Sequence, residues 1–283
     1  MIGSHRFFSR GPGPRVLLLG GVHGEEKPGV IALERLAAEF ESGGLSLARG
    51  QLTIVPRAND EAVARGLHFV DENLNRIVRP HEAPANREQG LASELAALIA
   101  AHDAVLDLHG APAPTVPFVF LDDESVPVRG WAEALGAEFL VMGWPALYAG
   151  AEALTTTGYA QSLGKRALTV EAGRNDDPAA AEFAFDAARR AIAHFGLIIG
   201  APRRPRPKAV RLTAMVRRER EGAFARPWSN FDPVTKGEVL ARYADGVELR
   251  APEDSVVVMP YEAAAVGEEW YYLAAPAALP DSW

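Results

Sequence analysis

Six short apolar runs, separated by helix-like segments, constrain the fold of this chain more than any other feature. The runs are nearly continuous in apolar residues and cover Val16–Leu19, Leu52–Val55, Val105–Leu108, Val116–Leu121, Phe139–Met142 and Leu168–Val170. Strands of this kind are typical of a sheet that is covered on both faces. The helix-like segments are rich in Ala, Leu and Glu and cover Val30–Phe40, Glu88–Ala101 and Pro178–Phe195. The alternation predicts an α/β fold with helices on both faces of the sheet.

The pattern changes after residue 200. The segment 201–208 is rich in Pro and Arg, which indicates an extended, solvated connector rather than a nucleic-acid-binding arm. Alternating apolar and polar residues then predict strands over 210–217, 248–250, 256–259 and 270–273, separated by turn signals such as Asp245-Gly246. We therefore expect one domain over residues 1–200 and a small all-β domain over residues 201–283, with 201–208 as the linker.

Composition excludes several classes of protein and site. The chain of 283 residues has no cysteine, so any metal must be held by nitrogen and oxygen ligands. Residues 1–200 hold 17 Lys and Arg against 25 Asp and Glu, which argues against a nucleic-acid partner. No apolar run reaches membrane-spanning length, and the first residues lack the apolar region of a signal peptide. We expect a cytoplasmic protein with no membrane partner.

Histidine and acidic residues stand at the ends of three of the apolar runs. The first run leads into His23-Gly24-Glu25-Glu26, the third ends in Asp107-Leu108-His109-Gly110, and the last ends in Thr169-Val170-Glu171. Because ligands of open α/β sheets gather at the carboxyl ends of strands, these side chains are expected in one cleft. Two imidazoles and one carboxylate form a three-ligand zinc site with an open position, and a further acidic residue can act as a general base. The alternative for each motif alone is a turn histidine or a loop glutamate in solvent.

The order of these motifs, together with Asn73-Leu74-Asn75-Arg76 between the first and second, resembles the succinylglutamate desuccinylase/aspartoacylase family of metallocarboxypeptidase-like zinc hydrolases. The resemblance implies a zinc-carboxypeptidase-like mixed sheet flanked by helices, with a small C-terminal all-β domain. It also implies one Zn²⁺ per chain, held by His23, Glu26 and His109, with Glu25 as a solvated neighbour.

The resemblance implies roles for further residues. Glu171 matches the catalytic glutamate, which takes a proton from water and passes it to the leaving amine, and Asn75 and Arg76 match the pair that grips a substrate carboxylate. Family members carry Asp where this chain has Asn73, and an arginine seven residues before the motif asparagine, where this chain has His68. We expect His68, or Arg65 nearby, to stabilise the oxyanion in place of that arginine.

A second family arginine, about ten residues before the catalytic glutamate, holds a carboxylate on the acyl group of the substrate. That position falls near Gln161, flanked by Tyr159 and Arg166, and we expect these three residues to contact the substrate. A neutral amide binds a carboxylate less strongly than a guanidinium does, so a neutral acyl group such as acetyl is expected to be preferred over succinyl. Arg166 would overturn this expectation if it reached the site.

The sequence thus predicts a zinc-dependent hydrolase that cleaves the amide bond of a small N-acyl amino acid or related N-acyl amine. A metallocarboxypeptidase that acts on peptides would share every ligand, and the two are distinguished by whether the C-terminal domain caps the cleft. A non-catalytic binding protein on the same scaffold is the other alternative, although it would have no need to retain all three ligands together with Glu171. A homo-oligomer is compatible with the sequence.

Overall fold

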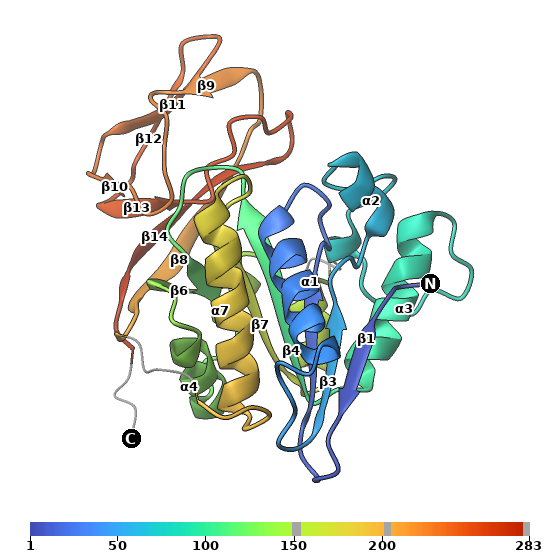
Figure 1. Cartoon of the computed structure of the whole chain (residues 1–283). Coiled ribbons are helices and arrows are strands. Elements are labelled where there is room, and N and C mark those ends of the chain that lie inside the picture. The colour runs from blue at the N-terminus through green and yellow to red at the C-terminus, as the bar shows by residue number, and fades with distance from the viewer. Residues whose placement is uncertain (149–153, 201–204, 280–283) are drawn as a thin grey trace.

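Within the described residues, eleven strands form one mixed sheet that runs through the chain (Figure 1). The computed structural model describes residues 1–148, 154–200 and 205–279. The order of the strands across the sheet is β1 (His5–Phe8), β3 (Gln51–Val55), β2 (Arg15–Gly20), β4 (Ala104–Ala111), β7 (Arg166–Arg174), β5 (Phe118–Phe120), β6 (Phe139–Met142), β8 (Lys208–Arg217), β14 (Glu269–Ala277), β13 (Ser255–Val258) and β10 (Pro233–Val234). The central strands β3, β2, β4 and β7 are parallel, so their carboxyl ends meet at one edge.

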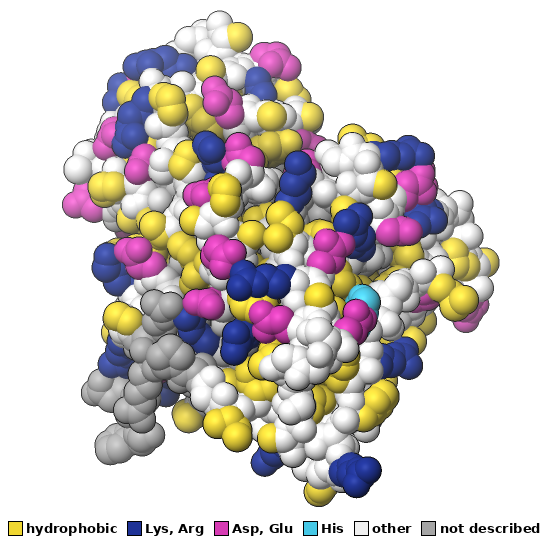
Figure 2. Space-filling view, in the orientation of Figure 1, with side chains coloured by type: hydrophobic (Ala, Val, Ile, Leu, Met, Phe, Trp, Pro, Cys, Tyr) yellow, Lys and Arg dark blue, Asp and Glu magenta, His cyan; other side chains and the backbone are white. Residues whose placement is uncertain are grey.

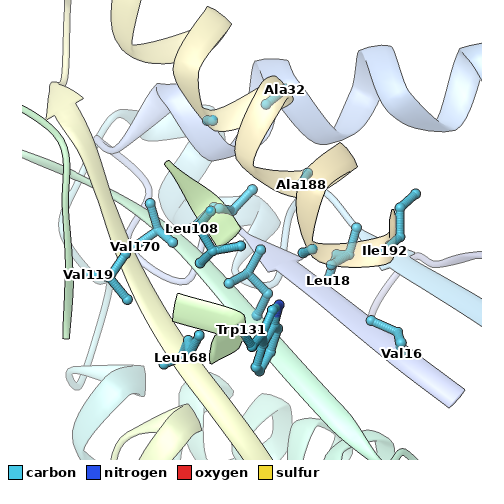
Figure 3. Close-up of a cluster of buried hydrophobic side chains, with 14 of the residues drawn as sticks. Val16, Leu18, Ala32, Leu108, Val119, Trp131, Leu168, Val170, Ala188 and Ile192 are labelled. Carbon is cyan, nitrogen blue, oxygen red and sulfur yellow. The ribbon is translucent and has the colours of Figure 1, made fainter. Parts of the chain in front are cut away.

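Helices cover both faces of the parallel part of the sheet. On one face lie α1 (Lys27–Glu41), α4 (Val126–Leu135) and α7 (Pro178–His194), and on the other lie α3 (Arg87–Ala100) and α6 (Thr156–Ser162). The side chains of β2 alternate between the two faces of the sheet. Val16 and Leu18 join the apolar core under α1, α4 and α7, and Leu17 and Leu19 join the second core, under α3 and α6. In Figure 3, the fully buried Trp131 of α4 lies among strand and helix side chains of the first core. Short helices α2 (Asp60–Arg65), η1 (Leu74–Arg76) and α5 (Trp144–Leu147) complete this part of the chain.

The C-terminal residues extend the large sheet and add a second one. Strand β8 pairs in parallel with β6, so the sheet continues without a break past residue 208. Strands β9 (Gly222–Phe224), β11 (Val239–Tyr243) and β12 (Glu248–Arg250) form a small antiparallel sheet. An apolar cluster around Trp228 and Trp270 contains residues of this sheet and of β13 and β14 of the large sheet. Residues 201–204 of the expected linker lie outside the described residues, and β8 already begins at Lys208. The domain boundary at residue 200 stays a prediction.

The predicted α/β fold with helices on both faces is confirmed, and each predicted strand and helix over residues 1–200 corresponds to an element. One expected strand is shorter than predicted: within 116–121 only Phe118–Phe120 is extended in the sheet, because Pro117 has no N–H to donate. Asp177 caps α7 by accepting a hydrogen bond from the Ala179 N–H, as its place before Pro178 indicates.

Charged side chains of both signs lie on the surface of the protein. On the face shown in Figure 2, acidic and basic side chains are interspersed, and neither sign forms a dominant patch. Among the described residues, no helix has the length and apolar character needed to cross a membrane.

Candidate functional site

The turn after β2 places His23 and Glu26 at the carboxyl edge of the sheet. Gly21 has φ +61°, which favours glycine, and a Cβ at Gly24 would lie 2.0 Å from the carbonyl carbon of Ala62. Glu26 is the residue before the first turn of α1, but its carboxylate makes no capping bond to that helix. The carboxylate is therefore free to face the strand ends.

Neighbouring parallel strands bring the second histidine and the second glutamate together. His109 on β4 is the register partner of Glu171 on β7, so the two residues lie side by side on adjacent strands. Asp107 precedes His109 by two residues and shares its face of β4. Its Oδ2 atom lies 2.9 Å from His109 Nε2, and it also accepts a hydrogen bond from the Thr156 hydroxyl.

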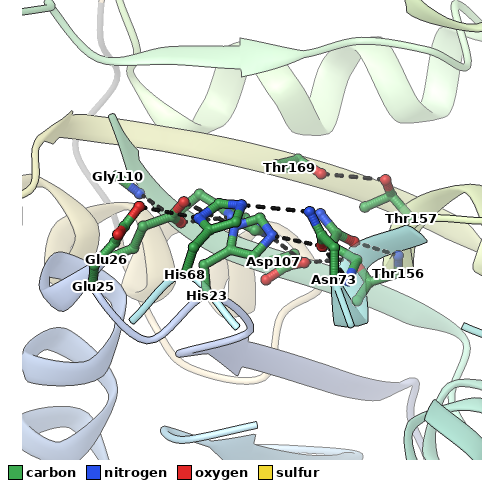
Figure 4. A network of polar contacts seen from close by, with 12 residues as sticks. His23, Glu25, Glu26, His68, Asn73, Asp107, Gly110, Thr156, Thr157 and Thr169 are labelled. Carbon is green, nitrogen blue, oxygen red and sulfur yellow. Dashed lines mark hydrogen bonds and ion pairs between the residues drawn. The ribbon is translucent and has the colours of Figure 1, made fainter. Parts of the chain in front are cut away.

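His23 and His109 both contact the carboxylate of Glu26, and Figure 4 shows the surroundings of His23 and Glu26. His23 Nδ1 lies 2.8 Å from Glu26 Oε1, and His109 Nδ1 lies 2.7 Å from Glu26 Oε2. The Gly110 N–H donates to the same Oε2 atom at 3.2 Å. All three side chains are buried, so three potential metal ligands converge in a region with little access to water.

Burial and mutual attraction shift the pKa values of these groups in different directions. Burial raises the pKa of a carboxyl, but the two imidazoles outweigh it and hold the pKa of Glu26 well below its usual range. Burial lowers the pKa of His23 in spite of Glu26. Burial also lowers the pKa of His109. The carboxylates of Asp107 and Glu26 outweigh this effect and hold the pKa of His109 well above its usual value. These shifts favour the charged forms of Glu26 and His109 and the neutral form of His23.

The three-residue cluster fits a zinc ion. One ligand atom from each of His23, Glu26 and His109 lies within 4.8 Å of the other two, and the donors are the nitrogen and oxygen types that zinc accepts. Asp107 at His109 Nε2 would orient the imidazole with Nδ1 toward the ion, which is the usual arrangement of a metal-binding histidine. A second group, formed by Glu25, Glu26 and His68, meets the same distance criterion, but Glu25 and His68 are only partly buried.

Glu171 lies beside this cluster without belonging to it. It is buried, and its Oε2 atom has no hydrogen-bond partner among the described residues. Burial, with a further contribution from Glu26, raises the pKa of Glu171 to about 8. An unpartnered carboxylate at a cluster of ligands is placed to exchange protons with a molecule in the pocket.

The segment before and within η1 contributes the polar groups opposite the strand ends. Asn73 accepts hydrogen bonds at Oδ1 from His23 Nε2 at 3.1 Å and from the Asn75 N–H at 2.9 Å. Asn75 is buried and accepts from the Thr156 N–H at 2.9 Å. Arg76 lines the pocket with Nη2 3.6 Å from Glu269 Oε2. These contacts fix Asn75 and Arg76 at the pocket wall.

The cavity around these residues has a volume of about 540 Å³ and is closed in part by the C-terminal strands and loops. Its C-terminal lining includes Arg217, Met259, Tyr261, Glu269 and Tyr272. The sequence motifs all lie before residue 200, so local patterns could not identify these residues. Arg217, Glu269 and Tyr272 reach the cavity because β8 and β14 continue the large sheet, and Met259 and Tyr261 follow the end of β13.

His68 and Arg65, the two expected substitutes for the missing arginine, lie in different surroundings. The His68 ring stacks on that of His23 with centroids 3.8 Å apart, and its Nδ1 lies 3.0 Å from Glu25 Oε1. Arg65 forms an ion pair with Glu61 on α2, and its side chain is 54% exposed. The structure therefore brings His68 to the cavity and does not bring Arg65 there.

The expected acyl-side residues Tyr159, Gln161 and Arg166 do not line the described cavity either. Tyr159 packs against the second apolar core, and Gln161 lies two residues further along α6. Arg166 begins β7 and lies with its guanidinium 5.7 Å from the ring centroid of Phe195. Five residues of extended chain separate it from Glu171, about 16 Å at the usual rise, so Arg166 lies at the opposite end of the strand.

The structure adds cavity residues that sequence reasoning missed. Asp122 follows the apolar run that contains β5, but β5 is antiparallel to β7, so the strand-end reasoning that led to His109 does not apply to it. Thr157 and Thr169 also line the cavity and contact each other through their hydroxyls at 3.2 Å. Trp144 lines it from the start of α5. No sequence pattern distinguishes these threonines or this tryptophan from packing residues.

Comparison with known proteins places the chain among acyl amino acid hydrolases. The sequence model of the succinylglutamate desuccinylase/aspartoacylase catalytic domain matches residues 12–198. The N-alpha-acetyl-L-2,4-diaminobutyric acid deacetylase of Halomonas elongata is 30% identical over 273 residues, which cover 88% of this chain and 78% of that protein. The succinylglutamate desuccinylase of Burkholderia orbicola is 32% identical over 135 residues, 43% of this chain and 39% of that protein. The chain thus spans well under half of this second relative.

Solved structures show the same fold. The product-bound ectoine utilization protein EutE (DoeB) of Ruegeria pomeroyi aligns with a TM-score of 0.80 at 24% identity, over 98% of this chain and 89% of that one. A succinylglutamate desuccinylase/aspartoacylase of Rhodobacter sphaeroides aligns with a TM-score of 0.78 at 22% identity, over 94% of this chain and 87% of that one.

Proposed function

The chain belongs to the succinylglutamate desuccinylase/aspartoacylase family, and we propose that it is a zinc-dependent hydrolase that cleaves the amide bond of a small N-acyl amino acid. The observation that carries the proposal is the convergence of His23, Glu26 and His109 beside the unpartnered carboxylate of Glu171. This is the constellation that metal-assisted hydrolysis of an amide requires: an open metal site and a base outside the ligand set.

In this proposal His23, Glu26 and His109 hold one Zn²⁺ per chain. When bound, the ion would polarise the acyl carbonyl and lower the pKa of water in the site. Glu171 accepts a proton from a water molecule while the oxygen of that water forms a bond to the carbonyl carbon. Glu171 then gives that proton to the amine nitrogen as the C–N bond breaks, so one water is consumed for each amide cleaved.

Two further groups would hold the substrate. Asn75 and Arg76 bind its carboxylate, because a guanidinium offers two parallel donors to such a group and the contacts with Thr156 and Glu269 keep both side chains at the wall. His68 donates a hydrogen bond to the developing oxyanion from its place against His23. Arg65, Tyr159, Gln161 and Arg166 have no role in the proposal.

The C-terminal lining of the cavity supports a deacylase over the alternative metallocarboxypeptidase. Met259, Tyr261 and Glu269 border the same space as His23 and Glu171, which limits the room for a peptide that extends beyond the cleaved bond. A volume of about 540 Å³ is suited to a small ligand.

A neutral acyl group such as acetyl remains the preferred one in this proposal. Of the described Lys and Arg side chains, Arg76 and Arg217 line the cavity, and both lie 3.6 Å from the same carboxylate, that of Glu269. With Arg76 assigned to the amino-acid carboxylate and Arg217 partly neutralised by Glu269, a succinyl carboxylate has no free cation to meet. A cytoplasmic location and a homo-oligomeric state stay predictions.

The test is hydrolysis of a panel of N-acetyl and N-succinyl amino acids, with matched amino acids and zinc-loaded protein. The proposal predicts release of free amino acid and a higher kcat/KM for the acetyl compounds. Hydrolysis of tripeptides from the carboxyl end, without cleavage of any N-acyl amino acid, would support the carboxypeptidase instead. A higher kcat/KM for the succinyl compounds would point to Arg217 as an acyl anchor.

A further inference from the structure

The rings of His23 and His68 lie stacked at the wall of the cavity, and both contact the same asparagine (Figure 4). Their centroids are 3.8 Å apart and their planes differ by 21°. The Nδ1 atom of His23 lies 2.8 Å from Glu26 Oε1. The Nδ1 atom of His68 lies 3.0 Å from Glu25 Oε1. Both Nε2 atoms contact the side-chain amide of Asn73, so two consecutive glutamates and one asparagine hold the pair of imidazoles.

A backbone contact fixes which end of the Asn73 amide faces each ring. Asn73 Oδ1 accepts a hydrogen bond from the Asn75 N–H at 2.9 Å, and a backbone N–H can only donate. The same Oδ1 atom lies 3.1 Å from His23 Nε2, and the Nδ2 atom lies 3.4 Å from His68 Nε2. The carbonyl end of the amide therefore faces His23, and the NH₂ end faces His68.

The two ends of the amide favour opposite tautomers of the two rings. A neutral imidazole carries one proton, and its other nitrogen accepts. Beside Asn73 Oδ1, a proton on His23 Nε2 is favoured, which leaves the Nδ1 lone pair toward Glu26 for a metal ion. Beside the NH₂ group, His68 Nε2 accepts, so the proton of His68 lies on Nδ1 and is donated to Glu25 Oε1.

An amide can serve both rings at once, and a carboxylate cannot. Ionised carboxylates accept hydrogen bonds and donate none. An aspartate at position 73 would match His23 Nε2 but would leave His68 Nε2 facing a second acceptor. In the part of the chain that the structure describes, no other hydrogen-bonding group contacts either Nε2 atom. The proton positions of both rings therefore depend on this one side chain.

We propose that Asn73 is a positioning residue that sets the proton positions of His23 and His68 in opposite senses. The inference rests on the proposed function and deepens it, because His23 is a metal ligand there and His68 is the donor to the oxyanion. With its proton on Nδ1, a neutral His68 presents a donor on the side of Glu25 and Glu26, where the metal ligands converge. The Glu25 side chain is 37% exposed, so water can solvate it when a substrate oxygen takes over this donor.

The same proton decides the role of the second group of possible ligands, Glu25, Glu26 and His68. A metal ion binds a lone pair of an imidazole nitrogen, and Nδ1 of His68 has none while it carries the proton. The group is therefore a hydrogen-bonded support of the first site, and the chain holds one metal ion.

The test reads the proton positions by NMR of protein with isotope-labelled histidine at about pH 8.5, above the ordinary titration range of histidine. The His68 signals are assigned by their loss in His68→Gln. In wild type, with and without zinc, His68 should carry its proton on Nδ1. In Asn73→Asp, His68 should carry a proton on Nε2, because that atom then faces a carboxylate. His102, whose Nδ1 lies 2.6 Å from the Leu98 carbonyl oxygen away from the cavity, is the internal control and should be unchanged.

Zinc affinity separates the two contacts of Asn73. Asn73→Ala removes the acceptor at His23 Nε2, so the Kd for zinc should rise by about 10–100-fold, the usual cost of losing a group that orients a ligand. Asn73→Asp retains that acceptor and the contact with the Asn75 N–H, so it should bind zinc at least as tightly as wild type. The conservative variant thus restores the partner of one ring and not that of the other, a combination that a merely structural role would not give.

Two NMR results would overturn the inference. One is a proton on His68 Nε2 in wild type, and the other is a His68 Nε2 without a proton in Asn73→Asp. Both are read without turnover, so they decide the matter even if Asn73→Ala does not fold. Equal losses of zinc affinity in Asn73→Ala and Asn73→Asp would refute the role toward His23. If no N-acyl amino acid is hydrolysed, the proposed function fails, and the proton positions still decide the inference.

Discussion

Asp107→Asn should weaken zinc binding although Asp107 contributes no ligand. The Asp107 carboxylate is fully buried and lies 2.9 Å from His109 Nε2, a close ionic contact outside hydrogen-bond geometry. Its negative charge favours the tautomer with a proton on Nε2 and a free lone pair on Nδ1, the atom that faces Glu26. An asparagine amide can present its NH₂ group to Nε2, which would favour the opposite tautomer and place a proton where the metal should bind. Loss of such an orienting partner typically costs 10–100-fold in metal affinity, so the Kd for zinc should rise by about that factor, or roughly 1.4–2.7 kcal/mol.

The assay is competition for zinc with a fluorescent chelator at fixed pH, applied to wild type, Asp107→Asn and Asp103→Asn. Asp103 precedes the same strand at its other end and forms a half-exposed ion pair with Arg15, so its variant carries the same chemical change away from the cluster. The control should bind zinc as wild type does. A folded Asp107→Asn variant whose Kd lies within twofold of wild type would show that the contact at Nε2 does not orient His109.

Three further predictions follow from the site and its supports. Glu171→Gln should retain one zinc per chain and lose about 10²–10⁴-fold in kcat, and near-normal turnover of the zinc-loaded variant would remove Glu171 from the chemistry. Since burial raises the pKa of Asp122 from 3.8 to about 7, native stability is penalised above that pH and not below about pH 4. Asp122→Asn should therefore raise the free energy of unfolding by roughly 1–4 kcal/mol more at about pH 8 than at about pH 4, and urea titrations with equal gains at both would contradict this. A Cβ at Gly29 would lie 2.4 Å from the Leu108 carbonyl oxygen, so Gly29→Ala should cost about 1–3 kcal/mol of stability, whereas Gly90→Ala in the open surroundings of α3 should not.

The sequence predicted the sheet and the strand-end residues because both depend on local signals. Continuous apolar runs identify strands that are buried on both faces, and parallel strands bring His23, His109 and Glu171 to one edge whatever the details of packing. Nothing local, however, indicates that β8 joins β6 or that Arg217 and Tyr272 reach the cavity.

The substrate contacts were harder to predict because a sequence offset does not fix a direction in space. Arg166 is close to Glu171 along the chain, but an extended strand carries it to the far end of the sheet. Arg65 is near the motif asparagine in sequence, yet the end of α2 directs it to Glu61. Asp122 follows an apolar run too, but its strand β5 is antiparallel to β7, so reasoning from the carboxyl ends of parallel strands could not place it in the cavity.

The central claim is that one zinc ion, held by His23, Glu26 and His109, is required for amide hydrolysis. It is tested most directly by measuring bound zinc and the rate of hydrolysis of an N-acetyl amino acid in the same preparation, before chelation, after chelation and after zinc is returned. The account predicts one zinc per chain, loss of hydrolysis with the metal and recovery with its return, and no such recovery in His109→Ala. Hydrolysis that survives complete removal of the metal, or full zinc occupancy together with full activity in His109→Ala, would contradict it.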